Sequence, residues 1–305
     1  MSKPAVTVGS GPAGAGRPSA NRPGPKRPSL RVERSLQREG FRILAGMDEV
    51  GRGALAGPVS VGVVLIDETC RSAPAGVADS KLLPPPRRRS LVAPVRRWAF
   101  AWAVGHAGPE EIDDIGIMAA LRLAGCRALE QIRAAAGVVP DLIILDGNHD
   151  WLTDPMRVGL FGAADDDTTE LTCVGDGSGR GVVGSHRPGE GPDPVHRVSR
   201  TPVRTLIKAD RSCSSVAAAS ILAKVERDDL MIALAADHPA YRWELNKGYA
   251  APEHLAALTA HGPCAFHRRS WQLPGVPEPA GMVRAGVPPL MGDDGGADAV
   301  EVSWT

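Results

Sequence analysis

The sequence predicts an α/β fold in which a mixed β-sheet is flanked by helices, with a C-terminal helical extension and disordered tails. Short apolar segments of strand length recur through the middle of the chain and are separated by segments with helical periodicity. Three strand-like segments come first, and helix and strand then alternate, an order typical of a mixed sheet covered by helices. An apolar fraction of 43% in 305 residues can supply the core of such a fold.

The two ends differ from the middle in charge and composition. Residues 1–40 are rich in Gly, Pro, Ser and Arg, and carry eight basic residues against two acidic ones. Residues 273–305 carry five acidic residues against one basic residue. We expect a disordered basic arm, order beginning near Phe41, and a disordered acidic tail, both solvated and without a specific role. Alternatively, each end acts on a polyanion, the arm by attraction and the tail by repulsion.

The first half of the domain predicted over residues 41–272 contains three strands. Residues 41–47 are an apolar run, and residues 59–65 have Val or Leu at every second position. Residues 84–96 begin with three prolines and predict a turn followed by a short helix. Residues 98–104 alternate and are rich in β-forming side chains, which predicts the third strand.

Helices and strands then alternate. Apolar residues spaced by three and four, from Ile117 to Ile132, predict a helix that stops at Gly137 and Pro140. Residues 142–145 and 203–207 predict two further strands, and residues 212–236 and 252–261 predict helices. Residues 153–200 are polar and Gly-rich, and such a long irregular stretch is uncommon inside a domain. We interpret it as an insertion, with a small hairpin over residues 171–174 and 182–183.

Cysteine content and hydropathy limit the location of the protein. The five cysteines are widely spaced and form no CxxC pair, which indicates reduced thiols and a cytoplasmic protein. The first thirty residues lack an apolar run, and no stretch approaches the roughly 20 apolar residues of a membrane span. We therefore expect no secretory signal and no contact with a membrane.

Acidic residues stand at the ends of three predicted strands. Asp48 and Glu49 follow the first strand, Asp146 follows residues 142–145, and Asp210 follows residues 203–207. If these strands are neighbours, the carboxylates converge at one edge of the sheet, where ligand sites of α/β sheets tend to lie. Carboxylates packed together repel one another, and a hard divalent cation resolves the repulsion. The set predicts a Mg²⁺ or Mn²⁺ site for phosphoryl-transfer chemistry rather than a zinc site.

Not every acid of this kind is a ligand. A lone Asp at a strand end is more often a turn former or helix cap, and we assign that role to Asp79 and Asp141. For Asp210 the capping role stays open beside the ligand role, because a long helix follows it. Asp48 and Glu49 are harder to explain in this way, since two adjacent acids at a buried strand end are costly without a partner.

Gly51, Arg52 and Gly53 come directly after this acidic pair. Glycine on either side of the arginine allows the backbone to approach a ligand closely, and the guanidinium supplies charge for a phosphate. The tripeptide is common in turns, but its position after Asp48 and Glu49 favours a nucleic-acid contact.

Six sequence blocks in fixed order resemble the bacterial ribonuclease HII family. They are MDEVGRGALAGPVSVGVV, DSKLL, LIILDGN, KADRSCSSVAAASILAKVERD, NKGYAAPEH and HRRSW, between Phe41 and Trp271. The first and fourth blocks are long and specific. The resemblance implies a ribonuclease H-like catalytic domain, an endonuclease that hydrolyses the RNA strand of RNA–DNA hybrids with Mg²⁺ or Mn²⁺. Its implied partners are RNA–DNA hybrid and ribonucleotide-containing duplex DNA, and the protein is expected to be a monomer.

The resemblance also implies roles for individual residues. Asp48, Glu49, Asp146 and Asp210 would be catalytic and metal-binding, and single ribonucleotides in duplex DNA would be cut on their 5′ side to leave a 3′-hydroxyl and a 5′-phosphate. The backbone of Gly51, Arg52 and Gly53 would recognise the ribose 2′-hydroxyl, which distinguishes RNA from DNA. Tyr249 would pack on the neighbouring sugar. Candidates for holding phosphates are Lys81, Ser212, Ser215 and Lys224, the serines at a helix start that offers free N–H groups.

Two features depart from the family pattern. The segment between Gly147 and Lys208 is much longer than in the family, and Gly116 stands where the family has Asn.

Two weaker patterns concern other ligands. His261, Cys264 and His267 have the spacing of a structural zinc site but no fourth ligand. The run Arg87, Arg88, Arg89 is most often a solvated helix face, or alternatively touches the hybrid backbone.

Two rival functions remain. A ribonuclease H-like fold also serves nucleases that act on DNA, so the substrate could differ within the same chemistry. The chain could instead be a non-catalytic module that binds hybrids, if the insertion has disrupted the site. Replacing ribose by deoxyribose in a substrate separates the first rival, and metal-dependent turnover separates the second.

Overall fold

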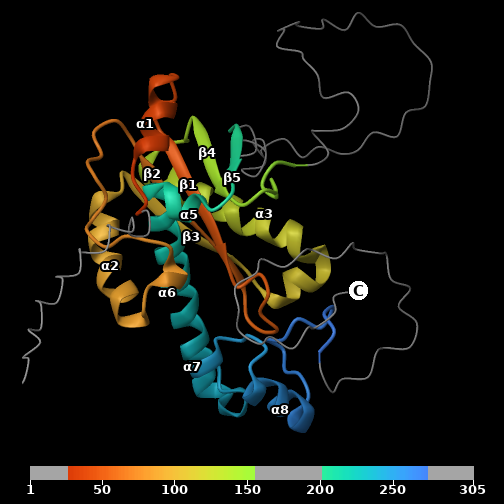
Figure 1. Cartoon of the computed structure of the whole chain (residues 1–305). Helices are drawn as coiled ribbons and strands as arrows, with labels where there is room; N and C mark the ends of the chain where they lie inside the picture. Colours follow the sequence, from red (N-terminus) through yellow and green to blue (C-terminus); the bar gives the residue numbers. More distant parts are fainter. Residues whose placement is uncertain (1–26, 155–200, 274–305) are drawn as a thin grey trace, which may run out of the picture.

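The computed structural model describes residues 27–154 and 201–273 (Figure 1). Its strands are β1 (Leu44–Val50), β2 (Val59–Ile66), β3 (Ala101–Ala107), β4 (Leu142–Asp146) and β5 (Val203–Leu206). Its longer helices are α1 (Arg31–Arg38), α2 (Pro85–Trp98), α3 (Pro109–Ala136), α6 (Ser214–Asp237) and α8 (Pro252–His261). The short ones are η1 (Ser80–Leu82), α5 (Ala209–Ser212), η3 (Pro239–Tyr241) and α7 (Trp243–Asn246). The predicted tail, the hairpin and nearly all of the insertion lie outside the described residues.

The five strands form one mixed sheet in the order β3-β2-β1-β4-β5, which confirms the predicted fold class. Strands β1, β2 and β3 pair antiparallel, and β4 and β5 join beside β1 in parallel. The switch in direction follows from the connections. A short turn can join antiparallel neighbours, whereas a parallel strand needs a long crossover, which α3 provides before β4.

Side chains alternate between the two faces of the sheet, and both faces are covered. On one face, Ala45 and Met47 of β1 pack with α3, and on the other Leu44 packs with α6. We call these the α3 face and the α6 face. Helix α6 lies so close to the sheet that a Cβ on Gly46 or Gly62 would come within 2.4 Å of the helix backbone. Only glycine permits this approach. Figure 1 shows α6 running along the sheet toward the C-terminal helices.

Several predicted boundaries shift in the structure. The first strand extends to Val50, so Asp48 and Glu49 lie within β1 rather than after it. The third strand begins at Ala101 because Trp98 is the last residue of α2. Gly116 interrupts α3 with a non-helical backbone at φ 78°, and divides it into two helical segments.

The expected disorder up to residue 40 is wrong for residues 27–40, which contain α1. This helix carries Leu36 into the α6-face core and buries Glu33 completely. Glu33 Oε1 accepts hydrogen bonds from the backbone N of Ser215, at 3.0 Å, and from its hydroxyl, at 2.9 Å. The acid thus occupies the N-terminus of α6, where free N–H groups favour a carboxylate. Helix α1 was not predicted because the arm is rich in Gly, Pro and Ser.

The C-terminal extension packs on the far half of α6. Leu55 and Ala56 from the β1–β2 loop share a core with Trp243, Tyr241 and Leu258 of the extension. The indole of Trp243 is fully buried and stacks on Tyr241 at 5.1 Å between ring centroids. None of the helices within residues 27–154 and 201–273 combines the length and apolarity that crossing a membrane requires.

Candidate metal and nucleic-acid site

The parallel pairing of β1 with β4 brings the first two predicted ligands together. Met47 is in register with Leu145, so Asp48 and Asp146 are adjacent on neighbouring strands. Both are even-numbered, like Leu44 of β1 and Leu142 and Ile144 of β4, whose side chains point to the α6 face. Asp210 comes from α5 on the same face. One carboxylate oxygen from each of Asp48, Asp146 and Asp210 lies within 4.8 Å of the others, and we call these three residues the carboxylate site.

A tight turn brings Asp210 into this set. After β5, Lys208 adopts a left-handed backbone with φ 57°, and α5 begins at the next residue. Asp146 Oδ1 then accepts a hydrogen bond of 2.6 Å from the backbone N of Ala209. Asp210 makes no side-chain cap to α5 or α6. The capping role that the sequence left open is therefore not the one that Asp210 has here.

Glu49 stands apart from the other three predicted ligands. Successive residues of a strand point to opposite faces, so Glu49 shares the α3 face with Ala45 and Met47. Among the described residues, its oxygens do not join the three that lie within 4.8 Å of one another. Its Oε1 lies 3.9 Å from Nη1 of Arg52. A ligand role for Glu49 stays a prediction.

The carboxylates repel one another in a half-buried setting. Burial, and then the charges of Glu49, Asp146 and Asp210, hold the pKa of Asp48 well above its usual range. Burial and the neighbouring Asp146 raise the pKa of Asp210 to about 6. Burial also raises the pKa of Asp146, against hydrogen bonds from the backbone of Ala209 and Asp210 that lower it. Burial and mutual repulsion therefore favour the protonated carboxyls, and a divalent cation at this site would favour their charged forms.

The donor set fits a hard divalent cation. All three residues offer carboxylate oxygens, which Mg²⁺ and Mn²⁺ prefer, and no thiolate or imidazole belongs to the set. Within the described residues, neither Lys nor Arg forms an ion pair with Asp48, Asp146 or Asp210. The compensating charge must come from a ligand or from more distant cations.

Lys81 is one such cation in the predicted set. Burial lowers the pKa of its ammonium, but the charges of Asp48, Asp79, Asp210 and Asp146 raise it further, so the net shift is upward. Asp79 Oδ1 accepts a hydrogen bond of 2.8 Å from the backbone N of Lys81 and caps η1. The predicted capping role of Asp79 is confirmed. Asp141 likewise binds backbone, through N–H donors of Arg42 and Ile43.

The Gly-Arg-Gly segment opens the β1–β2 loop beside the carboxylate site. Gly51 has φ 82°, and a Cβ there would lie 2.0 Å from Nε of Arg227. Gly53 is exposed, and a Cβ there would have nothing within 4 Å. Gly51 is thus required by the protein itself, whereas the open space at Gly53 leaves room for a ligand.

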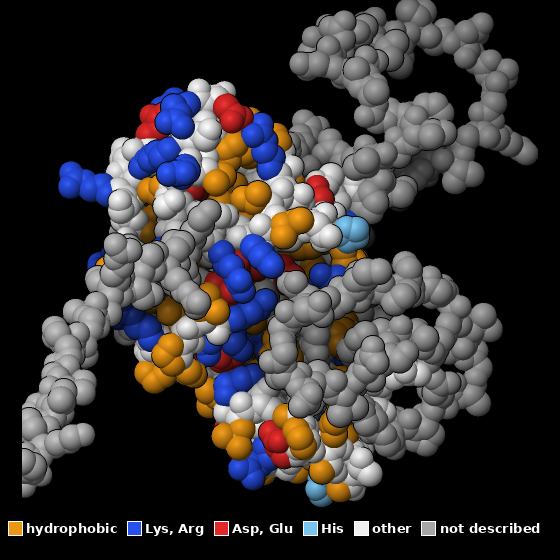
Figure 2. Space-filling model, in the orientation of Figure 1, with side chains coloured by type: hydrophobic (Ala, Val, Ile, Leu, Met, Phe, Trp, Pro, Cys, Tyr) orange, Lys and Arg blue, Asp and Glu red, His pale blue; other side chains and the backbone are white. Residues whose placement is uncertain are grey.

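Tyr249 and Lys224 meet in a hollow of about 320 Å³ between α6 and the α7–α8 connection. Lys224 Nζ lies 5.5 Å from the ring centroid of Tyr249 and 2.7 Å from Oδ1 of Asp228. Exposed or half-exposed cations include Arg89, Lys224 and Lys247 in the lining of the hollow, and Lys81, Lys208 and Arg211 near the carboxylate site. Figure 2 shows Lys and Arg side chains in a band down the middle of this face, from the level of α5 toward α7. Such a band attracts a polyanion.

The two predicted serines differ in outcome. Ser212 is half-buried in α5, with its hydroxyl 3.4 Å from the carbonyls of Lys208 and Ala209. Ser215 is completely buried, and its hydroxyl donates to Glu33. In this structure α1 occupies the helix start that a phosphate was expected to use, and a phosphate contact of Ser215 stays a prediction.

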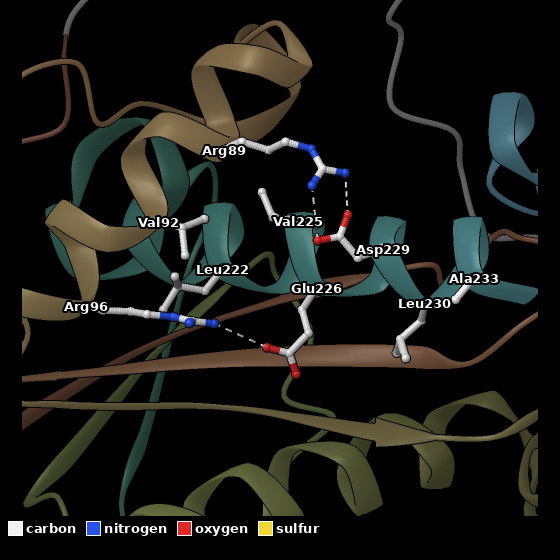
Figure 3. A pocket seen from close by; sticks show the side chains of 9 residues that line it. All are labelled: Arg89, Val92, Arg96, Leu222, Val225, Glu226, Asp229, Leu230 and Ala233. Carbon is white, nitrogen blue, oxygen red and sulfur yellow. Dashed lines mark hydrogen bonds and ion pairs between the residues drawn. The ribbon is translucent and has the colours of Figure 1, made fainter.

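The arginine run on α2 bonds to protein rather than standing free. Arg88 is buried and donates to the carbonyls of Ser80 and Leu83. Arg89 pairs with Asp229, and Arg96 with Glu226, across a hollow of about 480 Å³ between α2 and α6 (Figure 3). The charged groups of this hollow neutralise one another, so it offers a ligand no unpaired charge.

The zinc pattern does not form a metal site within the described residues. The nitrogen Nδ1 of His267 accepts a hydrogen bond of 3.0 Å from the backbone N of Cys264, and Nε2 lies 3.0 Å from Nε2 of His254. Both ring nitrogens of His267 therefore have protein partners. His254 donates from Nδ1 to the carbonyl of Tyr249 at 2.8 Å. The histidines hold the backbone around Tyr249 instead of a metal.

Two fully buried arginines, Arg227 and Arg268, have no role in the sequence predictions. Both belong to the family-like blocks, and their guanidinium groups hold the β1–β2 loop. A signal was present: Arg227 stands one helical turn after Ala223, on the apolar face of a helix, where an arginine needs a specific partner. The sequence could not show which partner it finds.

Comparisons with known proteins agree with this geometry. The sequence model of the family described as Ribonuclease HII matches residues 45–150 and 186–273. A ribonuclease HII of Streptomyces avermitilis is 41% identical over 245 residues, which cover 80% of this chain and 83% of that protein. One from Paracoccus denitrificans is 38% identical and covers 80% and 91% of the two chains. The crystal structure of ribonuclease H2 from Pyrococcus horikoshii, at 23% identity and a TM-score of 0.50, covers 76% of this chain and 94% of that one, and has a similar fold.

Proposed function

Because the chain belongs to the ribonuclease HII family of metal-dependent endoribonucleases, we propose that it removes ribonucleotides from DNA as well as cutting RNA–DNA hybrids. As a ribonuclease H, it acts on the RNA strand of such hybrids. The finer proposal is cleavage at a single ribonucleotide embedded in duplex DNA, on its 5′ side, leaving a 3′-hydroxyl and a 5′-phosphate. The observation that carries it is the convergence of Asp48, Asp146 and Asp210 beside an open glycine loop.

The carboxylate site would hold Mg²⁺ or Mn²⁺ through Asp48, Asp146 and Asp210, with Glu49 as a further candidate ligand. When bound, the metal supplies charge for the phosphate oxygens and a more acidic water. The protein's own part is to hold the three carboxylates in place on β1, β4 and α5. The β1–β4 pairing and the Ala209 hydrogen bond to Asp146 do this before the substrate arrives.

Recognition of ribose would lie in the β1–β2 loop. The backbone of Gly51, Arg52 and Gly53 runs beside the carboxylate site, and Gly53 has open space on its side. A 2′-hydroxyl can both donate and accept, so backbone groups can bind it without a charged side chain. Tyr249 would pack on the adjacent sugar, while Lys81 and Lys224 would approach phosphates of the substrate backbone. Ser212 stays a candidate for a phosphate contact near the same site.

We further propose that the protein acts as a monomer in the cytoplasm. The described cysteines, at positions 70, 126, 213 and 264, are free thiols, which supports a reducing environment.

A cleavage assay on a duplex with one embedded ribonucleotide tests the proposal. With Mg²⁺ or Mn²⁺ we expect one cut on the 5′ side of the ribonucleotide, and with a chelator we expect none. Mapping the ends by gel mobility against chemically defined markers identifies the 3′-hydroxyl and the 5′-phosphate.

Two control substrates separate the rival functions. Cutting an otherwise identical all-deoxyribose duplex at the same rate would favour a DNA nuclease and contradict the proposal. Binding without turnover in any metal would favour a non-catalytic hybrid-binding module. Cutting only continuous hybrids would leave the ribonuclease H activity but refute the role in single-ribonucleotide removal.

A further inference from the structure

Two buried guanidinium groups join the β1–β2 loop to the segment that carries Tyr249. Arg227 comes from the middle of α6 and Arg268 from the segment after α8, and both side chains are fully buried. Among the described residues neither forms an ion pair with a carboxylate. Their partners are backbone carbonyls instead. We call these two residues the arginine bracket.

The hydrogen bonds that the Arg268 guanidinium donates all go to the loop. Its guanidinium donates to the carbonyls of Gly51 at 2.6 Å, Arg52 at 2.8 Å and Gly57 at 3.1 Å. Its own backbone N donates to the carbonyl of Leu55 at 3.0 Å. A planar fork with several fixed donors can bind carbonyls that point in different directions, which a lysine ammonium on a flexible stem does less well.

Arg227 connects the same loop to the Tyr249 segment. Its Nε donates to the carbonyl of Pro58 at 2.8 Å, its Nη2 to Ala56 at 3.1 Å, and its Nη1 to Lys247 at 3.0 Å. Its Cζ also lies 5.3 Å from the ring centroid of Tyr249. One side chain thus contacts the loop, the backbone before Tyr249 and the Tyr249 ring.

Backbone bonds close the same junction. The N–H groups of Leu55 and Ala56 both donate to the carbonyl of Gly248, at 2.8 and 3.2 Å. Gly248 has φ 84°, and a Cβ there would lie 2.5 Å from the carbonyl oxygen of Ala56. The loop and the Tyr249 segment are therefore packed against each other with no space for a side chain between them.

We propose that Arg227 and Arg268 are positioning residues that fix the spacing between the Gly51–Gly53 backbone and Tyr249, and thereby set the discrimination of a ribonucleotide–DNA junction. This inference rests on the proposed function, in which the loop reads the ribose and Tyr249 reads the adjoining sugar. Neither arginine contacts substrate. Each acts by holding two recognition elements that come from distant parts of the chain, and a shift of about 1 Å between such elements costs as much as 100-fold in rate.

The first test compares wild type with Arg268→Lys and Arg227→Lys on two substrates. On the single-ribonucleotide duplex we expect KM to rise about tenfold or more with a smaller change in kcat. On a continuous RNA–DNA hybrid, where every register presents ribose, we expect a much smaller change. Equal losses on both substrates, or wild-type values on both, would overturn the proposal.

A matched control separates positioning from general destabilisation. Glu33→Ala weakens the packing of α1 on α6, at Ser215, with no direct bond to the bracket. We expect this variant to lower the melting temperature while leaving the ratio of kcat/KM between the two substrates unchanged. If Glu33→Ala shifts that ratio as the lysine variants do, the selectivity reports stability alone and the proposal is wrong.

A second readout does not depend on substrate. Hydrogen exchange should become faster at the amides of Leu55, Ala56 and Gly57 in the lysine variants, while amides of β2 stay protected. Unchanged exchange in a folded variant would overturn the proposal even if wild type failed to cut single ribonucleotides, so failure of the proposed function is distinguishable. If a lysine variant does not fold, Gly248→Ala perturbs the same junction without removing a charge, and we expect the same loss of selectivity.

Discussion

The carboxylate site and the arginine bracket bury like charges in opposite ways. Asp48, Asp146 and Asp210 face one another, no Lys or Arg of residues 27–154 and 201–273 is in hydrogen-bonding contact with them, and their pKa values are raised. Arg227 and Arg268 are more deeply buried, yet each has three backbone carbonyls as partners. Burial lowers the pKa of Arg268 to about 9, which still leaves it charged at neutral pH.

This difference separates a binding site from a structural joint. An incomplete set of charges on a rigid support has an affinity for a ligand of opposite charge, because the protein has not neutralised it. A complete set has no free donor for a ligand and stabilises only the conformation in which its partners meet. Buried charges without partners therefore indicate a metal site at the three carboxylates, whereas buried charges with a full set of partners indicate a positioning role for the two arginines.

The largest expected effect is loss of activity at the carboxylate site. Asp48→Asn or Asp146→Asn should reduce metal-dependent cleavage by about 1000-fold or more, because the variant loses part of the cation's ligand set. The melting temperature should stay the same or rise, since a repelling charge is removed. Asp229→Asn, at an exposed carboxylate paired with Arg89, is the control and should keep activity. A fully active Asp48 or Asp146 variant contradicts the assignment.

The bracket should respond in stability where the carboxylate site does not. Arg268→Met leaves the carbonyls of Gly51, Arg52 and Gly57 buried without donors, and should lower the free energy of unfolding by about 3 kcal/mol. Urea unfolding measures this quantity. Arg133→Met, which removes an exposed ion pair with Glu130, should change it by less than about 0.5 kcal/mol. Similar values for the two variants would mean that the bracket is not a structural joint.

Metal-free stability should fall with rising pH because of the carboxylate site. A carboxyl whose pKa is raised on folding binds its proton more tightly in the folded state. Its contribution is therefore complete below its unfolded pKa, and for Asp210 it is lost as pH rises from about 4 through about 6. Thermal unfolding with a chelator and with Mg²⁺, at pH 5 and pH 7.5, measures it. Mg²⁺ should raise the melting temperature by a few degrees more at pH 7.5, and an equal increase at both pH values would count against the site.

The smallest expected effect distinguishes the two sides of the glycine loop. Gly53→Ala adds a methyl group in open space, so the melting temperature should stay unchanged while KM for the single-ribonucleotide duplex rises roughly fivefold. Gly51→Ala meets Arg227 and an unfavourable φ, and should also lower stability by about 1–2 kcal/mol. Steady-state kinetics and thermal unfolding of both variants check this. An unaffected KM in Gly53→Ala would place the 2′-hydroxyl elsewhere.

Local pattern was enough for most of the fold. Each strand and each long helix from residue 44 onward matches a predicted segment, because apolar periodicity and Gly or Pro boundaries act over short distances. The ends agree within a few residues except at α3, which begins at Pro109 instead of near Ile117. Helix α1 was missed for the same reason. Its surroundings are polar and Gly-rich, and its stability comes from Glu33 and Leu36, whose contacts lie elsewhere in the chain.

The candidate site, too, could be predicted only in part from local pattern. Strand-end acids predicted the carboxylate site, and the parallel pairing of β1 with β4 makes Asp48 and Asp146 neighbours. Glu49, next to Asp48 in sequence, points to the other face, since side chains alternate on a strand. Ser215 was expected at a phosphate and is covered by α1. These outcomes depend on which face of the sheet a side chain points to and on which segment covers it. Residue types alone do not determine either.

The sequence by itself determined an α/β chain with acids at strand ends, a glycine loop beside them and the blocks typical of ribonuclease HII. Only the tertiary structure decided that three acids share one face, that α1 belongs to the domain, and that two arginines join the loop to Tyr249. The physical reason is range. Helix and strand formation follow local periodicity, whereas the partner of a buried charge is chosen by packing between segments that are distant in sequence.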